Sequence, residues 1–154
     1  MNLYVYKLKA TWNRVSYEEI LLDCVGSGNE EDPAIIEPSE YLPDSFSIFN
    51  SNTFINIRNC IKRFIGFKLS QNISLKDCKI NNCLVDNSSK INIKNVIIDN
   101  YLKVHSSDHI YITDSNIKKL KLKQASSNII KNCTIQKIKE IKGFSNTFQD
   151  IKSM

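Results

Sequence analysis

Polar and apolar residues repeat along residues 51–154 with a nearly fixed period. An Asn or Asp recurs at nearly equal intervals throughout this part of the chain. The six positions are Asn59, Asp77, Asn95, Asp114, Asn132 and Asp150. Between them lie short stretches in which apolar residues alternate with polar ones. Alternation with period 2 indicates β-strands, and a repeat of constant length indicates stacked structural units.

Three short strands in each unit predict one coil of a parallel β-solenoid, in which equivalent residues of successive coils stack ~4.8 Å apart. The apolar pairs are unevenly spaced within each unit. A left-handed β-helix needs strictly even spacing, so we favour a right-handed coil. We therefore predict an all-β fold: a single-stranded, right-handed parallel β-helix of about six coils over residues 45–154. One interior column is predicted to contain Ile65, Cys83, Tyr101, Leu120 and Ile138.

The repeated Asn/Asp position is predicted to be a structural corner. Asn and Asp tolerate left-handed backbone geometry, and stacked amides can bond from one coil to the next. The position that follows places Cys60, Cys78 and Cys133 in one interior column. The odd total of five cysteines does not suggest a disulfide framework. Free cysteine packs as a small hydrophobic residue, so we expect buried free thiols.

Residues 1–44 lie outside the repeat. The stretch 3–10 has the composition of a strand, and the capping-box pattern at 16–19 predicts a short helix that ends at Gly26. Residues 27–44 are predicted to form an acidic loop. We expect this strand, helix and loop to be an N-terminal cap that covers the unpaired strands at one end of the solenoid. The alternative is an acidic arm that binds a partner.

Charge is divided unevenly along the chain. Residues 1–50 contain three basic and nine acidic residues, and residues 51–154 contain 18 basic and seven acidic ones, so their net charges are −6 and +11. Such asymmetry favours either a surface that binds polyanions or an acidic segment that folds over a basic body.

One outward column of the predicted solenoid is basic, and we call it the basic stripe. It consists of Arg58, Lys76, Lys94 and Lys131, interrupted by Thr113 and with Tyr111 beside it. A row of cations at strand spacing can hold nucleic acid, an acidic polysaccharide or an acidic protein. We therefore expect the basic stripe and Tyr111 to form a binding site.

Two segments, Ile73-Ser-Leu-Lys-Asp-Cys78 and Ile129-Ile-Lys-Asn-Cys133, resemble the repeats of right-handed parallel β-helix proteins with the pectate-lyase-like architecture. In coil length and residue pattern they look more similar to the C-terminal domain of cyclase-associated protein and to the tubulin cofactor C domain. The resemblance covers about two-thirds of the chain. It implies a compact β-helix that acts on an actin or tubulin partner.

Residues with catalytic chemistry are scattered in the predicted solenoid. Polysaccharide-cleaving enzymes need paired carboxylates, whereas Asp86, Asp99 and Asp108 fall at corners or at single outward positions. His105 and His109 flank a predicted corner and would diverge, so they do not indicate a metal site. We predict no cofactor and no metal, and we lean against an enzyme.

The first functional hypothesis is a non-catalytic interaction or scaffold module that binds a protein partner, such as a cytoskeletal monomer, or self-assembles through its coil ends. The alternatives are a carbohydrate-binding or carbohydrate-active β-helix, and nucleic-acid binding by the basic stripe. The N-terminal residues lack a signal-peptide pattern, and no apolar run is long enough to span a membrane. We therefore expect a cytoplasmic protein without membrane association.

Overall fold

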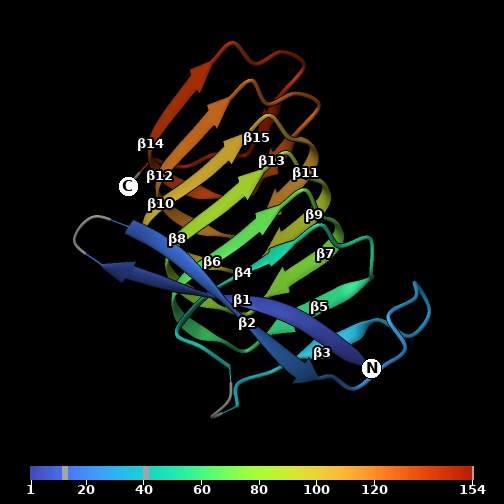
Figure 1. The fold of residues 1–154 in the computed structure, drawn as a ribbon. Coiled ribbons are helices and arrows are strands. Elements are labelled where there is room, and N and C mark those ends of the chain that lie inside the picture. Colours follow the sequence, from blue (N-terminus) through green and yellow to red (C-terminus); the bar gives the residue numbers. More distant parts are fainter. Residues whose placement is uncertain (12–13, 40–41, 154) are drawn as a thin grey trace.

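The structure is a computed structural model that describes the chain except residues 12–13, 40–41 and 154. The described residues contain fifteen strands and no helix. Successive coils climb from the N-terminal to the C-terminal end (Figure 1). The predicted all-β solenoid of about six coils is therefore confirmed, whereas its handedness stays a prediction.

Two sheets run along the solenoid, and within each the coil strands pair in parallel. The long-strand sheet contains β4 (Ser45–Phe49), β6 (Ile61–Lys68), β8 (Lys79–Asp86), β10 (Ile97–His105), β12 (Asn116–Lys123) and β14 (Thr134–Ile141). The short-strand sheet contains β3 (Ala34–Ile36), β5 (Ile55–Arg58), β7 (Gln71–Lys76), β9 (Ser89–Lys94), β11 (Asp108–Thr113), β13 (Ile129–Lys131) and β15 (Thr147–Gln149).

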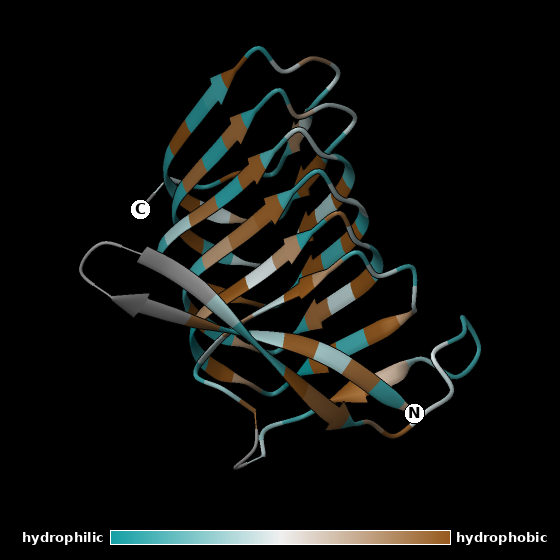
Figure 2. Ribbon diagram, viewed as in Figure 1, coloured by the Kyte–Doolittle hydropathy of each residue, from teal (hydrophilic) through white to brown (hydrophobic). Residues whose placement is uncertain are grey.

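Interior columns of apolar residues hold the two sheets together. In the short-strand sheet, Ile57, Leu75 and Ile93 are register partners in consecutive coils, and all three are fully buried. Hydrophobic and hydrophilic residues alternate along the strands of the coils (Figure 2). Burying each such side chain contributes about 1.5–3 kcal/mol. The stacked columns are therefore a main source of the stability of the fold.

One interior column differs from the prediction in the coil between Asn95 and Asp114, which is longer than its neighbours. Tyr101 is exposed, and Leu102 takes the buried position, where it pairs with Cys83. The register shifts between Ile98 and Tyr101 because this coil contains an extra residue there. Such a bulge turns a side chain to the opposite face. At the other end of the column, Ile138 is in register with Leu120 but is 41% exposed, because it lies in the last long strand.

Each complete coil turns at residues with left-handed backbone. The six predicted Asn/Asp corners all have φ between 52° and 57°. Hydrogen bonds of 2.6 Å join Asn95 to Asp77 and Asn132 to Asp114 across neighbouring coils. The predicted corner ladder is confirmed. Its hydrogen bonds join the corners of neighbouring coils to one another.

A second corner contains a ladder of buried serines that the sequence analysis missed. The Ser70 N–H donates a 3.2 Å hydrogen bond to the hydroxyl of Ser88, and the Ser88 N–H donates one of 3.0 Å to the hydroxyl of Ser107. The Ser88 hydroxyl in turn donates to the carbonyl of Asp86. The hydroxyls thus accept hydrogen bonds from backbone N–H groups at the corner. Buried backbone groups need such partners.

The N-terminal residues form a hairpin of β1 (Asn2–Thr11) and β2 (Arg14–Asp23). The predicted helix is wrong, because Leu22 alternates with exposed neighbours and pairs with buried Leu3 across the hairpin. Tertiary pairing overrides a local capping pattern here. Strand β1 pairs antiparallel with β4 at the N-terminal end of the long-strand sheet (Figure 1). The predicted acidic loop contains the short strand β3, and residues 40–41 of that loop lie outside the described residues.

All five cysteines are buried and free, which confirms the prediction for Cys60, Cys78 and Cys133 of the interior column. Complete burial raises the pKa of the Cys83 thiol to about 12. The pKa of Cys78 is raised by its thiol hydrogen bond with Cys60 and by burial. The Cys78 and Cys83 thiols are therefore protonated at neutral pH, and all five thiols pack as part of the core.

Candidate polyanion-binding surface

The basic stripe lies where the sequence places it, on the outer side of the short-strand sheet. Its members are register neighbours in the order Arg58, Lys76, Lys94, Thr113 and Lys131. Tyr111, two residues before Thr113 on β11, is 42% exposed and points to the same side. The five residues predicted for a binding site therefore share one face, while their role in binding stays a prediction.

Carboxylates balance part of the basic stripe. Arg58 Nε lies 2.7 Å from a carboxylate oxygen of Glu37, and Lys94 Nζ lies 3.9 Å from one of Asp114. Another ion pair joins Asp44 to Arg63. The acidic segment thus contacts the basic body through Glu37 and Asp44, in the manner of the folding-over alternative. Surface ion pairs add little stability, but they reduce the positive potential that a polyanion would meet.

A denser group of cations covers the outer side of the long-strand sheet at its C-terminal half. We call it the lysine face. It consists of Lys103, Lys119, Lys121, Lys123, Lys137 and Lys139, on strands β10, β12 and β14. The local sequence explains the arrangement, since in β12 the buried Leu120 and Leu122 alternate with lysines that must point outward.

The lysines stack across the sheet in register. Lys103 pairs with Lys121, which pairs with Lys139, and Lys119 pairs with Lys137. Neighbouring strands are ~4.8 Å apart, and successive outward residues on one strand are about 6.6 Å apart. Like charges at these distances repel one another. Binding of an anion that screens these charges therefore stabilises the lysine face.

Carboxylates in the described residues do not neutralise the lysine face. None of its six lysines makes an ion pair with another described residue. Two acids of the same sheet have other partners: Asp86 lies 2.9 Å from His105, and Asp99 lies 3.4 Å from Lys79. Glu140 is in register with Leu122 but is exposed, and it accepts a hydrogen bond from Asn146. The positive charges of the lysine face are therefore not paired with carboxylates of the described residues.

The sequence analysis missed the lysine face although its signal is present. Residues 118–123 alternate lysine with leucine, but the outward positions were followed only along the first strand of each coil. Following the outward positions of the longer strand would have placed Lys103, Lys121 and Lys139 in one column. The carboxylate partners of the basic stripe are not apparent from spacing.

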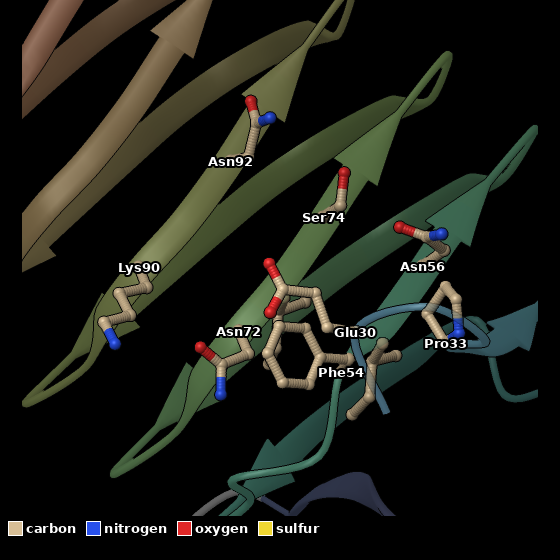
Figure 3. A pocket seen from close by; sticks show the side chains of 10 residues that line it. Glu30, Pro33, Phe54, Asn56, Asn72, Ser74, Lys90 and Asn92 are labelled. Atoms are coloured by element: carbon tan, nitrogen blue, oxygen red, sulfur yellow. The ribbon is translucent and has the colours of Figure 1, made fainter. Parts of the chain in front are cut away.

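A polar groove of about 420 Å³ lies between the segment around residues 30–33 and the outer side of the short-strand sheet. Figure 3 shows Glu30 and Phe54 beside Asn72 and Ser74, with Lys90 and Asn92 on the next strand. Its lining includes Glu30, Phe54, Asn56, Asn72, Ser74, Lys90 and Asn92. Among the described residues, Ser74 Oγ is buried without a hydrogen-bond partner. An unpaired buried hydroxyl is costly and is available to a polar ligand.

The candidate catalytic and metal-binding residues form two separate His–Asp pairs, and Asp99 pairs with Lys79 instead. His105 contacts Asp86 and Gln124, whereas His109 lies 3.0 Å from Asp108. The described residues contain no group of three His, Cys, Asp or Glu side chains that could hold a metal ion.

Comparisons with protein-family models, with curated proteins and with solved structures gave no match. In the described part of the chain, no helix has the length and apolar character needed to cross a membrane. The resemblance to cyclase-associated protein and tubulin cofactor C therefore stays at the level of architecture, a parallel β-solenoid.

Proposed function

We propose that this protein is a non-catalytic β-solenoid that binds the phosphate backbone of nucleic acid through the lysine face. The observation that carries the proposal is a set of six lysines on three adjacent strands, without carboxylate partners among the described residues. Binding a polyanion there releases its counterions and relieves repulsion between the lysines.

The chemistry of the face favours contacts with phosphate rather than with base edges. Lysine is a compact, strongly hydrated point charge that binds phosphate without a fixed orientation. Reading a base pair requires bidentate groups such as Arg, Asn or Gln in a groove, and none of the six residues supplies one. We expect binding that depends little on sequence and falls steeply as salt rises.

The basic stripe is the weaker of the two basic surfaces. Arg58 and Lys94 already face carboxylates, whereas the lysine face has no such partner in the described residues. Binding of a protein partner stays a prediction. An acidic protein would compete for the same lysines, so such a partner is one outcome of the test.

The test compares two variants with the same change in net charge. One is Lys121→Glu with Lys139→Glu, on the lysine face, and the control is Lys76→Glu with Lys94→Glu, on the basic stripe. Fluorescence anisotropy with labelled DNA at low salt should show about a 10- to 100-fold loss of affinity in the first variant and little change in the second. Both must unfold cooperatively near the wild-type temperature.

Other outcomes change the conclusion. Equal losses in both variants would mean that only net charge matters, and a larger loss in the control would return the site to the basic stripe. Heparin and an acidic peptide serve as competing probes. If either binds through Lys121 and Lys139 while DNA does not, the ligand is an acidic polysaccharide or an acidic protein.

The polar groove supports a second candidate function, binding of a sugar. Its amides and the unpaired Ser74 hydroxyl can each donate or accept hydrogen bonds, as sugar hydroxyls do. Phe54 offers an apolar surface beside them. Saturation-transfer NMR with cellobiose and N-acetylglucosamine tests this candidate. Asn92→Leu should remove the signal, and Asn116→Leu, on the long-strand sheet, should not.

A further inference from the structure

An exposed aromatic side chain lies beside the lysine face. Tyr101 occupies the outward position next to the buried Leu102, in register with Asn82 of the preceding coil, and is 37% exposed. Leu102 pairs with Leu120, so Tyr101 lies next to Lys119, the residue before Leu120. Along its own strand, Tyr101 is two residues from Lys103.

Nothing in the packing of the solenoid explains an outward tyrosine at this position. The corresponding residue of the preceding coil is Asn82, and Leu102 already fills the interior column. Bulges recur next to functional sites. Here the coil that contains the bulge has an aromatic ring, in place of Asn82, at an outward position beside Lys103 and Lys119.

We infer that Tyr101 stacks on an unpaired base, and that the lysine face therefore prefers single-stranded nucleic acid to duplex. This inference rests on the proposed function. Proteins that bind single strands combine a cationic surface that follows the backbone with aromatic rings on which bases stack. In a duplex the bases are already stacked and paired, so no base is free to stack on the ring of Tyr101.

A second apolar surface lies on the same three strands. A depression of about 390 Å³ at the start of β10, β12 and β14 is lined by residues that include Ile97 and Lys118. Ile97 is 45% exposed, and its register partner in β8 is Lys79. Asp99 also lines the depression, where its carboxylate pairs with Lys79. The exposed isoleucine offers a further apolar contact for an unstacked base, whereas a phosphate gains nothing from it.

The chain offers a matched control for Tyr101. Tyr111 is a second outward tyrosine of similar exposure, but it lies on the short-strand sheet beside the basic stripe. The variants are Tyr101→Ala, Tyr101→Phe and Tyr111→Ala. The probes are a labelled oligothymidylate of about 15 nucleotides, near the upper site size of known single-strand binders, and a duplex of equal length.

We expect Tyr101→Ala to weaken binding of the single strand about tenfold and to leave duplex binding within about twofold, because stacking on one base is lost. Tyr101→Phe keeps the ring and should bind nearly as wild type does. Tyr111→Ala should change neither affinity. A 2-aminopurine base in the oligonucleotide reports stacking directly, and its fluorescence should be quenched by wild type, by Tyr101→Phe and by Tyr111→Ala but not by Tyr101→Ala.

The inference is overturned if Tyr101→Ala binds the single strand as tightly as wild type, or if it weakens single strand and duplex equally. Either result leaves the proposed function standing, provided that Lys121→Glu with Lys139→Glu still weakens binding about 10- to 100-fold. If that double variant binds normally, the proposed function itself fails.

Discussion

The side-chain amide of Asn95 donates a hydrogen bond of 2.6 Å to the carboxylate of Asp77, which occupies the same corner one coil earlier. Both residues have left-handed backbone, with φ of 53° and 52°. The corner ladder places Asn and Asp in alternation along all six coils. An amide between two carboxylates separates like charges and donates a hydrogen bond that a carboxylate cannot.

Asn95→Asp should therefore destabilise the fold in a pH-dependent way. Two carboxylates would face each other at a corner where a hydrogen bond now stands. We expect a loss of about 1 kcal/mol in the free energy of unfolding at pH 7. This is the low end of the range for a lost hydrogen bond, because the site is exposed to water. The loss should largely disappear near pH 3, where carboxylates are protonated. Urea unfolding at both pH values measures it, and an equal loss at both would contradict the role of charge.

Leu69→Asn should stabilise the protein. Leu69 is 55% exposed and has φ of 52°, a left-handed conformation that is costly for leucine and well tolerated by Asn. The same corner of the neighbouring coils contains Asn50 and Asn87. We expect a gain of about 0.5–1 kcal/mol, or about 1–4 °C in melting temperature. Leu21→Asn, at an equally exposed position in a regular strand, is the control and should not stabilise.

Cys83 should make the fold sensitive to alkali. Burial raises the pKa of its thiol to about 12 from an ordinary value of 9.0. Above pH 9 the unfolded chain releases this proton while the folded chain keeps it, so the stability present below pH 9 is lost as pH rises toward 12. At pH 10.5 the loss is about 2 kcal/mol relative to pH 8.

The comparison for Cys83 is Cys83→Val, which fills the same interior position without an ionisable group. Its unfolding free energy should fall less steeply between pH 8 and pH 10.5 than that of wild type. Parallel curves for the two proteins would mean that this thiol does not contribute to the alkaline loss.

Ile93→Asp should prevent folding, because it places a charge in a fully buried column. Lys94→Asp changes the adjacent, exposed residue and should leave a cooperative unfolding transition. Circular dichroism with thermal melting distinguishes the two. A folded Ile93→Asp variant would show that the interior register is wrong.

The repeat made the coils predictable because stacking forces each position to keep its environment. The Asn/Asp corners and the cysteine column follow from that rule. Tyr101 was misplaced because an extra residue within a coil shifts the register at a point that spacing alone does not locate. The helix expected after residue 16 failed because pairing between Leu3 and Leu22 outweighs a capping pattern.

The binding surface was harder to predict than the fold. Spacing correctly placed the basic stripe on one face, but the contact of Arg58 with Glu37 joins residues from different parts of the chain. A pattern of charges in sequence does not show which cations already have partners. The lysine face differs from the basic stripe in that respect, which only the folded structure makes visible.

The most direct test of the account is the salt dependence of DNA binding. The slope of log K against log salt counts the phosphates that are neutralised. Replacing Lys121 by Gln should reduce the magnitude of that slope by about 0.7–0.9, and replacing Lys94 by Gln should leave it unchanged. The opposite pattern, or a wild-type slope near zero, would contradict the claim that the lysine face binds nucleic acid.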